Sequence, residues 1–284
     1  MTLQEALRLG RRLLAPISDE ASLETELLLA HVLKTDRVHL YQRLQEPLSP
    51  RQETAFRALL ARRQDREPTP YIVGRKEFYG LELLVTPAAI VPRPETELLV
   101  EVALAEARRI LERKGSVSIV DVGAGCGAIA CAIAADLPRA EVTATDVSAR
   151  ALALAQRNAQ RLGLAQRICF LRGNLLEPLT GPVDVIAANL PYVRSPDWEQ
   201  LPPEIRDHEP RRGLDGGADG LRAIRRLLRQ APPYLEPDGA LVLEIGDDQG
   251  AAGQALARAA FPTAHIEVRR DLAGLDRVLL VRVP

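Results

Sequence analysis

A short apolar run that ends abruptly in a rigid polar segment constrains the fold of this chain most. Residues 183–188 read Val-Asp-Val-Ile-Ala-Ala, and Asn189-Leu190-Pro191-Tyr192 follow directly. The run predicts a strand covered on both faces, and Pro191 ends it because proline cannot continue a central ladder. Ligands of open α/β sheets bind beyond the carboxyl ends of strands. Asn189 would offer an amide oxygen and an NH2 group there, although an ordinary strand followed by a turn explains the segment too.

Length and composition narrow the class of protein. With 284 residues the chain exceeds the usual size of one domain, and its net charge of -1 creates no field that would attract nucleic acid or membranes. It has no apolar run of membrane-spanning length and no signal-peptide pattern at its start. Its three cysteines, Cys126, Cys131 and Cys169, form no metal-binding group with histidine. We therefore expect a cytoplasmic protein with reduced thiols, no metal site and two domains.

The first 70 residues are predicted to form a separate helical domain. Thr2 with Glu5 is a capping-box pattern, and Ser49-Pro50-Arg51-Gln52 combines an N-cap, a proline at the first helical position and a second capping box. Nothing there resembles a catalytic grouping, and His31 and His39 are interpreted as ordinary helix histidines. A domain without chemistry of its own usually docks something, so we expect residues 1–70 to dock a partner.

Residues 71–92 are interpreted as a linker that follows the proline-rich segment at 67–70. Two short strands of a hairpin are expected there, at 78–81 and 83–85. The remaining chain, 93–284, would be the catalytic domain. It opens with Arg93-Pro94-Glu95-Thr96-Glu97, in which two prolines close to Arg93 fix the entrance of a helix. This segment is either a simple helix start or a wall of the ligand site.

A glycine-rich turn and an acid predict the cofactor. Residues 118–122 form an apolar strand, and Gly123-Ala124-Gly125-Cys126-Gly127 lead into a helix. Asp146 ends the next strand about twenty residues after the turn, where an acid typically binds ribose hydroxyls. Asp121 lies inside the first strand, so the pattern is not the dinucleotide fingerprint, which keeps helix amides free for a pyrophosphate. The pattern suits S-adenosylmethionine, which has no phosphate but has an amino-acid end to hold.

Two further stretches complete the predicted sheet and its surroundings. Asn174 follows a strand at 168–171. The carboxyl edge of the predicted sheet would therefore carry four such positions: Gly123, Asp146, Asn174 and Asn189. The last two strands should pair antiparallel because the connection at 271–274 is short. Residues 193–220 are irregular in sequence and are interpreted as a substrate-binding lid.

These motifs resemble those of class I S-adenosylmethionine-dependent methyltransferases that methylate amino groups. The matching residues are Asp121-x-Gly123-x-Gly125-x-Gly127, Asp146 and Asn189-x-Pro191-Tyr192. The helical N-terminal domain, the segments 93–97 and 275–278, and Glu209-Pro210 with Gly216-Gly217 extend the resemblance over nearly the whole chain, to the release-factor glutamine N5-methyltransferases (the HemK family). Where that family has Asn-Pro-Pro-Tyr, this chain has Leu190 at the second position.

The resemblance implies a fold and an activity. The fold would be α/β, a seven-stranded, mostly parallel Rossmann-like methyltransferase sheet preceded by a small all-helical domain and a hairpin linker. The activity would be methyl transfer from S-adenosylmethionine to the N5 amide nitrogen of the glutamine in the Gly-Gly-Gln motif of peptide-chain release factors. These release factors are the implied partners, with no membrane and no sequence-specific nucleic-acid binding.

The resemblance also implies which residues form the site. The implied cofactor-binding residues are Arg93, Asp121, Gly123, Ala124, Gly125, Gly127, Asp146, Val147, Asn174 and Asn189. The implied catalytic residues are Asn189, Leu190, Pro191 and Tyr192. The implied substrate-binding residues are these four with Phe78 and Glu209, although Phe78 could equally belong to the core. No metal is implied.

The implied chemistry needs orientation more than a strong base, because the sulfonium methyl group is already activated. The Asn189 side-chain oxygen and the Leu190 carbonyl would accept the two N–H bonds of the substrate amide and aim the nitrogen at the methyl group. Two alternatives stay open. An exocyclic amine of adenine or guanine in RNA or DNA presents the same two donors, and the protein could bind S-adenosylmethionine without catalysis.

Overall fold

The computed structural model describes all residues from 1 to 284, and they divide into two compact units. The first comprises Met1–Arg75 and Pro202–His208, and the second comprises Lys76–Leu201 and Glu209–Pro284. The segment at 202–208 belongs to the first unit, whereas the sequence placed it in the catalytic domain. Two ion pairs explain this, because Glu204 binds Arg63 at 2.9 Å and Arg66 at 3.0 Å.

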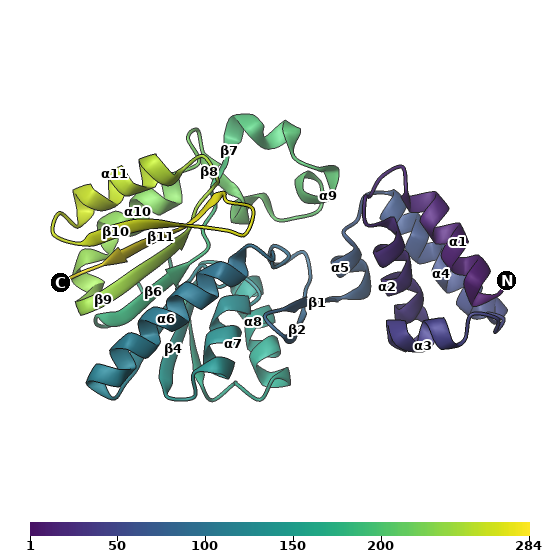
Figure 1. Cartoon of the computed structure of the whole chain (residues 1–284), viewed down its shortest axis with the longest axis horizontal. Coiled ribbons are helices and arrows are strands. Elements are labelled where there is room, and N and C mark those ends of the chain that lie inside the picture. Colours follow the sequence, from purple (N-terminus) through teal and green to yellow (C-terminus); the bar gives the residue numbers. More distant parts are fainter. The chain divides into compact units, whose positions relative to one another are not determined.

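The first unit is helical, as predicted (Figure 1). Its helices are α1 (Leu3–Leu14), α2 (Ala21–Leu33), α3 (Arg37–Gln42), α4 (Pro50–Gln64), α5 (Thr69–Val73) and α9 (Pro203–Arg206). Both predicted capping boxes, Thr2 with Glu5 and Ser49 with Gln52, are present. The proline-rich segment at 67–70 leads into helix α5, so the first residues of the predicted linker at 71–92 are helical, because proline in a first helical turn sacrifices no hydrogen bond.

A two-stranded hairpin follows this unit, formed by β1 (Arg75–Phe78) and β2 (Leu81–Leu84). The first strand is earlier than predicted, because Tyr79 and Gly80 form the turn rather than strand residues. Both have positive φ, 50° and 72°, which is the conformation of a tight two-residue hairpin turn. Tyr79 is not a residue that sequence patterns associate with this conformation, and this explains the error.

The second unit contains a seven-stranded sheet of order β10-β11-β9-β6-β3-β4-β5. Its strands are β3 (Val117–Val122), β4 (Ala140–Asp146), β5 (Ile168–Arg172), β6 (Val183–Ala188), β9 (Leu235–Glu244), β10 (His265–Arg270) and β11 (Asp276–Arg282). Strands β3, β4, β5, β6 and β9 are mutually parallel. Strand β11 is antiparallel to both β9 and β10, which confirms the predicted terminal pair. The parallel strands therefore bring their carboxyl ends to one edge.

Helices cover both faces of this sheet, which explains the continuous apolar run in β6. One core cluster combines residues of α6 (Thr96–Lys114), α7 (Ala128–Asp136) and α8 (Ala149–Arg161) with alternate residues of β3 such as Ile119. The other combines residues of α10 (Arg222–Gln230) and α11 (Gly250–Ala260) with the intervening residues of β3, such as Val120. Every residue of β6 is buried. No helix of the chain has the length and apolar character to cross a membrane.

The stretch at 193–220 is more ordered than its composition indicates. It contains β7 (Val193–Arg194), the 3-10 turns Ser195–Gln200 and Arg211–Gly213, and β8 (Asp215–Gly217), which pairs with β7 in parallel. Trp198 is buried, and the Arg211 guanidinium lies 4.6 Å from the centre of its ring. Short pairings and one cation–π contact thus order a segment that has few apolar residues.

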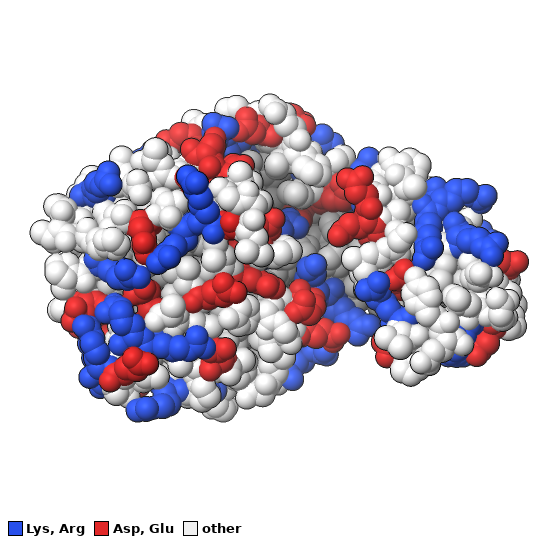
Figure 2. All heavy atoms as spheres, viewed as in Figure 1, with Lys and Arg blue, Asp and Glu red and all other residues white.

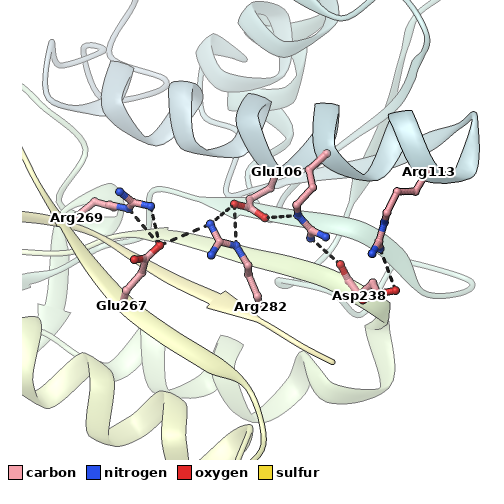
Figure 3. Close-up of polar contacts among 7 residues, drawn as sticks. Glu106, Arg113, Asp238, Glu267, Arg269 and Arg282 are labelled. Atoms are coloured by element: carbon pink, nitrogen blue, oxygen red, sulfur yellow. Dashed lines mark hydrogen bonds and ion pairs between the residues drawn. The ribbon is translucent and has the colours of Figure 1, made fainter.

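An ionic cluster attaches helix α6 to the strands beside it (Figure 3). Glu106 of α6 accepts hydrogen bonds from Arg282 of β11 at 2.6 Å and from Arg109 at 3.0 Å. Arg113 of the same helix pairs with Asp238 of β9 at 2.9 Å. Burial raises the pKa of Glu106, but the hydrogen bonds from Arg282 and Arg109 outweigh this effect and hold the pKa below its usual range. This charged group fixes the helix that begins, at its other end, beside the candidate site.

Candidate functional site

A cavity of about 360 Å³ opens in the second unit where the parallel strands end. Its volume falls within the range of small-molecule sites, roughly 300–1,000 Å³. The predicted site residues that line it are Gly123, Gly125, Asp146, Val147, Asn174, Asn189, Leu190 and Pro191. The structure thus brings together residues from the ends of β3, β4, β5 and β6.

The glycine turn after β3 owes its shape to residues without side chains. Gly123, Gly125 and Gly127 all have positive φ, 78°, 56° and 83°, which L-residues rarely adopt. A Cβ atom on Gly127 would lie 2.9 Å from the Cβ of Ala155, so this glycine permits α7 to pack closely on α8. Gly127 and Ala124 do not line the cavity, and the amide of Ala124 donates to the carbonyl of Thr145 at 2.9 Å.

Asp146 connects the end of β4 to that turn. Its Oδ2 atom accepts a hydrogen bond from the amide of Gly125 at 3.0 Å, and its Oδ1 atom accepts one from the amide of Ser148 at 2.7 Å. Both oxygens keep a further lone pair, because each carboxylate oxygen can accept twice. Asp146 also lines the cavity and can therefore accept hydrogen bonds from a ligand's hydroxyl groups.

Asp121 lies behind the turn rather than in the cavity. It is fully buried, its Oδ2 atom accepts from the amide of Ala130 at 3.0 Å, and its Oδ1 atom has no hydrogen-bond partner. Burial raises the pKa of this carboxyl to about 7. Its contact with the first turn of α7 fixes the helix relative to β3. Among the predicted cofactor residues, Asp121 is thus placed to act on the turn and not on a ligand.

Asn174, which follows β5, also lines the cavity. Its Nδ2 atom donates to Glu177 at 2.9 Å, which leaves its carbonyl oxygen for another donor. An adenine amino group is such a donor, and an amide oxygen can accept from it as an acid would.

The residues that follow β6 lie partly at the cavity and partly against the core. Asn189 lines the cavity, and its Nδ2 atom donates to Thr96 Oγ1 at 3.0 Å. The Leu190 side chain is buried and packs beneath Gly123. Tyr192 does not line the cavity; its partly buried ring packs against the core, and its hydroxyl donates to Glu244 at 3.0 Å. Burial and the nearby Glu244 raise the pKa of Tyr192 above its usual value.

Arg93, Glu209 and Phe78 do not line the cavity. Arg93 forms an ion pair with the buried Glu209, whose Oε2 atom also accepts from the amide of Val91 at 3.2 Å. Burial raises the pKa of Glu209, and Arg93 opposes this effect. Phe78 is 1% exposed in the core that α6 shares, so the structure supports the alternative that the sequence left open.

Several residues of the site were not foreseen from the sequence. The additional lining residues include Ala88, Ala89, Ile90, Ser148, Gly173, Pro210, Arg212, Gly213 and Arg222. Thr96, which accepts from Asn189, lies in the segment at 93–97, where the sequence pattern emphasised the prolines and not the threonine. Glu244 ends the apolar strand β9 as Asn189 follows β6, so the same strand-end signal could have identified it.

Comparisons with known proteins agree with this geometry. Residues 5–74 match the PrmC N-terminal domain family, and residues 95–200 match the methyltransferase small domain family. The solved structure of a methyltransferase from Pyrococcus furiosus has a TM-score of 0.55 at 19% identity, over 78% of this chain and 98% of that one. A 16S rRNA N2 G1207 methyltransferase of T. thermophilus, solved with AdoMet and guanosine, has a TM-score of 0.50 at 19% identity, over 74% and 50%. These similarities establish the fold.

Two curated relatives establish the family. The release factor glutamine methyltransferase of Moorella thermoacetica is 44% identical over 282 residues, which cover 99% of this chain and 98% of the relative. The release factor glutamine methyltransferase of Geobacter sulfurreducens is 42% identical over 267 residues, which cover 93% and 90%. On this similarity along nearly its whole length, the chain belongs to the family of release factor glutamine methyltransferases.

Proposed function

We propose that this protein transfers a methyl group from S-adenosylmethionine to the N5 amide nitrogen of the glutamine in the Gly-Gly-Gln motif of peptide-chain release factors. The observation that carries the proposal is the position of Asn189. Its NH2 group donates a hydrogen bond to Thr96, so its amide oxygen remains free to accept from a ligand in the cavity. The names of the two curated relatives support the substrate class.

The residues around the cavity fit S-adenosylmethionine. Asp146 would accept from the ribose hydroxyls, the Asn174 oxygen from the adenine amino group, and the glycine turn leaves room for the amino-acid end. Asp121 and Arg93 would act indirectly, by holding the turn and the wall at Glu209. When bound, this cofactor supplies a methyl group on a positively charged sulfur, which is activated for attack by a nitrogen.

The protein's contribution to the reaction is to orient the substrate amide. Asn189 Oδ1 and the Leu190 carbonyl would each accept one N–H bond, which directs the nitrogen lone pair toward the methyl group. Leucine retains the backbone carbonyl that this contact needs, and Pro191 lines the cavity beside it. Orientation of this kind can contribute about 7–11 kcal/mol to lowering a barrier. Tyr192, Phe78 and Glu209 would hold this segment and its walls from behind.

We further propose that the helical unit docks the release factor. It contributes no residue to the cavity, yet α3 exposes two large apolar side chains, Val38 at 65% and Tyr41 at 47%. Exposed apolar groups of this size are suited to a protein partner.

An amino methyltransferase acting on adenine or guanine is the second candidate, because a base amine offers the same two N–H donors. Acidic and basic side chains are interspersed on the face in Figure 2, and the net charge is -1. A nucleic-acid enzyme would usually present a basic stripe for the phosphate backbone. The net charge and the mixed charges on this face therefore favour a protein substrate.

The deciding experiment offers both kinds of substrate to the purified protein with radiolabelled S-adenosylmethionine. We expect the label in an intact release factor, with mass spectrometry locating one methyl group on the glutamine of Gly-Gly-Gln. A release factor with that glutamine changed to alanine is the matched control and should remain unlabelled. Methylated RNA or DNA beside an unmodified release factor would overturn the proposal.

A further inference from the structure

The backbone carbonyl of Tyr192 is held by the side chain of Gln249. The Nε2 atom of Gln249 donates to the Tyr192 carbonyl oxygen at 3.0 Å, and its Oε1 atom accepts from the amide of Gly246 at 3.0 Å. Gln249 is 5% exposed, so little water competes for these two bonds. Both polar ends of one buried side chain are therefore used, and one of them acts on the proposed catalytic segment at 189–192.

The two backbone partners permit only one orientation of the Gln249 amide. A carbonyl oxygen only accepts and a backbone N–H group only donates, so the NH2 group has to face Tyr192 and the oxygen has to face Gly246. The backbone amide of Gln249 also donates to the Gly246 carbonyl at 3.0 Å, which closes a tight turn before α11. This turn follows β9, the parallel neighbour of β6, so Gln249 joins the ends of two adjacent strands.

The chain packs closely around the same part of the backbone. A Cβ atom on Gly220 would lie 2.3 Å from the Tyr192 carbonyl oxygen and 2.5 Å from Gln249 Nε2. A Cβ atom on Gly216 would lie 2.7 Å from the Pro191 carbonyl oxygen. The hydrogen bond and the close approach of two glycines therefore leave the backbone at 191 and 192 little freedom.

Few rotatable bonds separate the Tyr192 carbonyl from the Leu190 carbonyl. The ring of Pro191 fixes its φ at about -65°, and a residue that precedes a proline is itself restricted. The free rotations that remain are ψ of Pro191 and φ and ψ of Tyr192. A hydrogen bond that fixes the second carbonyl thus limits the direction of the first, which is the one proposed to accept an N–H bond of the substrate.

We propose that Gln249 is a positioning residue for methyl transfer, which acts through the Tyr192 carbonyl to aim the Leu190 carbonyl at the substrate amide. The inference rests on the proposed function and adds to it a residue that does not line the cavity. Loss of the Gln249 bond should leave the proposed cofactor contacts in place, because Asp146 and Asn174 follow other strands.

The test measures methylation by variants of Gln249 in the full-length protein. Gln249→Met has nearly the same length and removes both bonds, and Gln249→Asn is too short to span Gly246 and Tyr192 together. We expect either variant to lower kcat for an intact release factor about tenfold or more. The KM for the release factor and the Kd for S-adenosylmethionine, the latter from calorimetry, should change little, because the lost effect concerns orientation in the transition state.

Gln254 of the same helix provides the matched control. It is half-buried and its side chain forms no hydrogen bond, so Gln254→Met should retain the wild-type kcat. A short Gly-Gly-Gln peptide is the second substrate. Gln249→Met should lower kcat by the same factor for the peptide and for the intact release factor, because both present the same amide.

The inference is overturned if Gln249→Met is folded by thermal melting and retains the wild-type kcat; where that variant does not fold, Gln249→Asn decides. It is also overturned if Gln254→Met loses as much activity, or if the Kd for S-adenosylmethionine rises by as large a factor as kcat falls. A loss confined to the intact release factor would assign Gln249 to docking instead. A wild-type protein that does not label the release factor contradicts the proposed function, so the two failures are distinct.

Discussion

The Asp146 carboxylate accepts a hydrogen bond from the amide of Gly125 at 3.0 Å, which joins the end of β4 to the glycine turn after β3. The acid therefore has two functions in the proposed cofactor site. It would accept from the ligand's hydroxyl groups, and it holds the glycine turn that would approach the ligand.

Substitution of Asp146 should separate these functions. Asp146→Ala removes both and should weaken S-adenosylmethionine binding by about 1.5–3 kcal/mol, which corresponds to roughly 10- to 150-fold. Asp146→Asn keeps one oxygen and should lose less. Isothermal titration calorimetry measures both affinities, and unchanged binding in the alanine variant would exclude Asp146 from the cofactor site.

Gly216 makes room for the backbone of the proposed catalytic segment. A Cβ atom there would lie 2.3 Å from the Gly220 carbonyl oxygen and 2.7 Å from that of Pro191, and neither backbone can yield easily. Gly216→Ala should destabilise the protein by about 1–3 kcal/mol and lower kcat by displacing Pro191. Gly181→Ala is the matched control, because a Cβ atom at that position meets nothing within 4 Å. Urea denaturation and methylation assays of both variants check this, and equal stability of the two variants would contradict it.

The buried Asp121 should make stability depend on pH. Its pKa is raised from 3.8 to about 7 by burial, so the folded protein binds this proton more tightly than the unfolded chain. Stability from this group is therefore greatest at low pH and decreases as the pH rises from about 4 to about 7. Asp121→Asn removes the titration and still accepts from Ala130. In the absence of cofactor, its Tm relative to wild type should be higher at pH 8 than at pH 5, and an equal difference at both would contradict the assignment.

Docking by the helical unit can be tested on its exposed apolar residues. Val38→Asp places a charge on the proposed docking surface, and it should raise the KM for an intact release factor without changing kcat for a short Gly-Gly-Gln peptide. Val38→Thr has the same shape and should have a smaller effect. Steady-state kinetics with both substrates provide the measurement. An unchanged KM for the intact protein would exclude this part of α3 from docking.

The strand-end residues show what sequence alone can predict about a site of this kind. Apolar runs that end in Asp146 or Asn189 define both the strands and their functional ends, because parallel strands share one edge. The same patterns do not reveal whether a side chain lines the cavity or packs behind it. Asp121 and Tyr192 were therefore predicted to belong to the site, although their side chains contact Ala130 and Glu244 and do not line the cavity. Whether a polar residue contacts a ligand or another residue depends on side chains far away in sequence, such as Thr96 and Glu244.

Local sequence rules also failed where tertiary contacts dominate. The proline-rich segment at 67–70 resembles a linker yet begins a helix, and Tyr79 occupies a turn position that usually favours glycine or asparagine. The segment at 202–208 has no apolar pattern to indicate its unit, and ion pairs with Arg63 and Arg66 decide its place.

That segment has a consequence for attempts to treat the helical unit as a separate module. The chain passes between the two units three times, after residues 75, 201 and 208. A truncation before residue 76 would remove Arg63 and Arg66 and leave the carboxylate of Glu204 without either cation. A chimera that exchanges only the N-terminal helices between relatives would separate the same charges. A graft of this unit therefore has to include residues 202–208, which lie more than a hundred positions further along the chain.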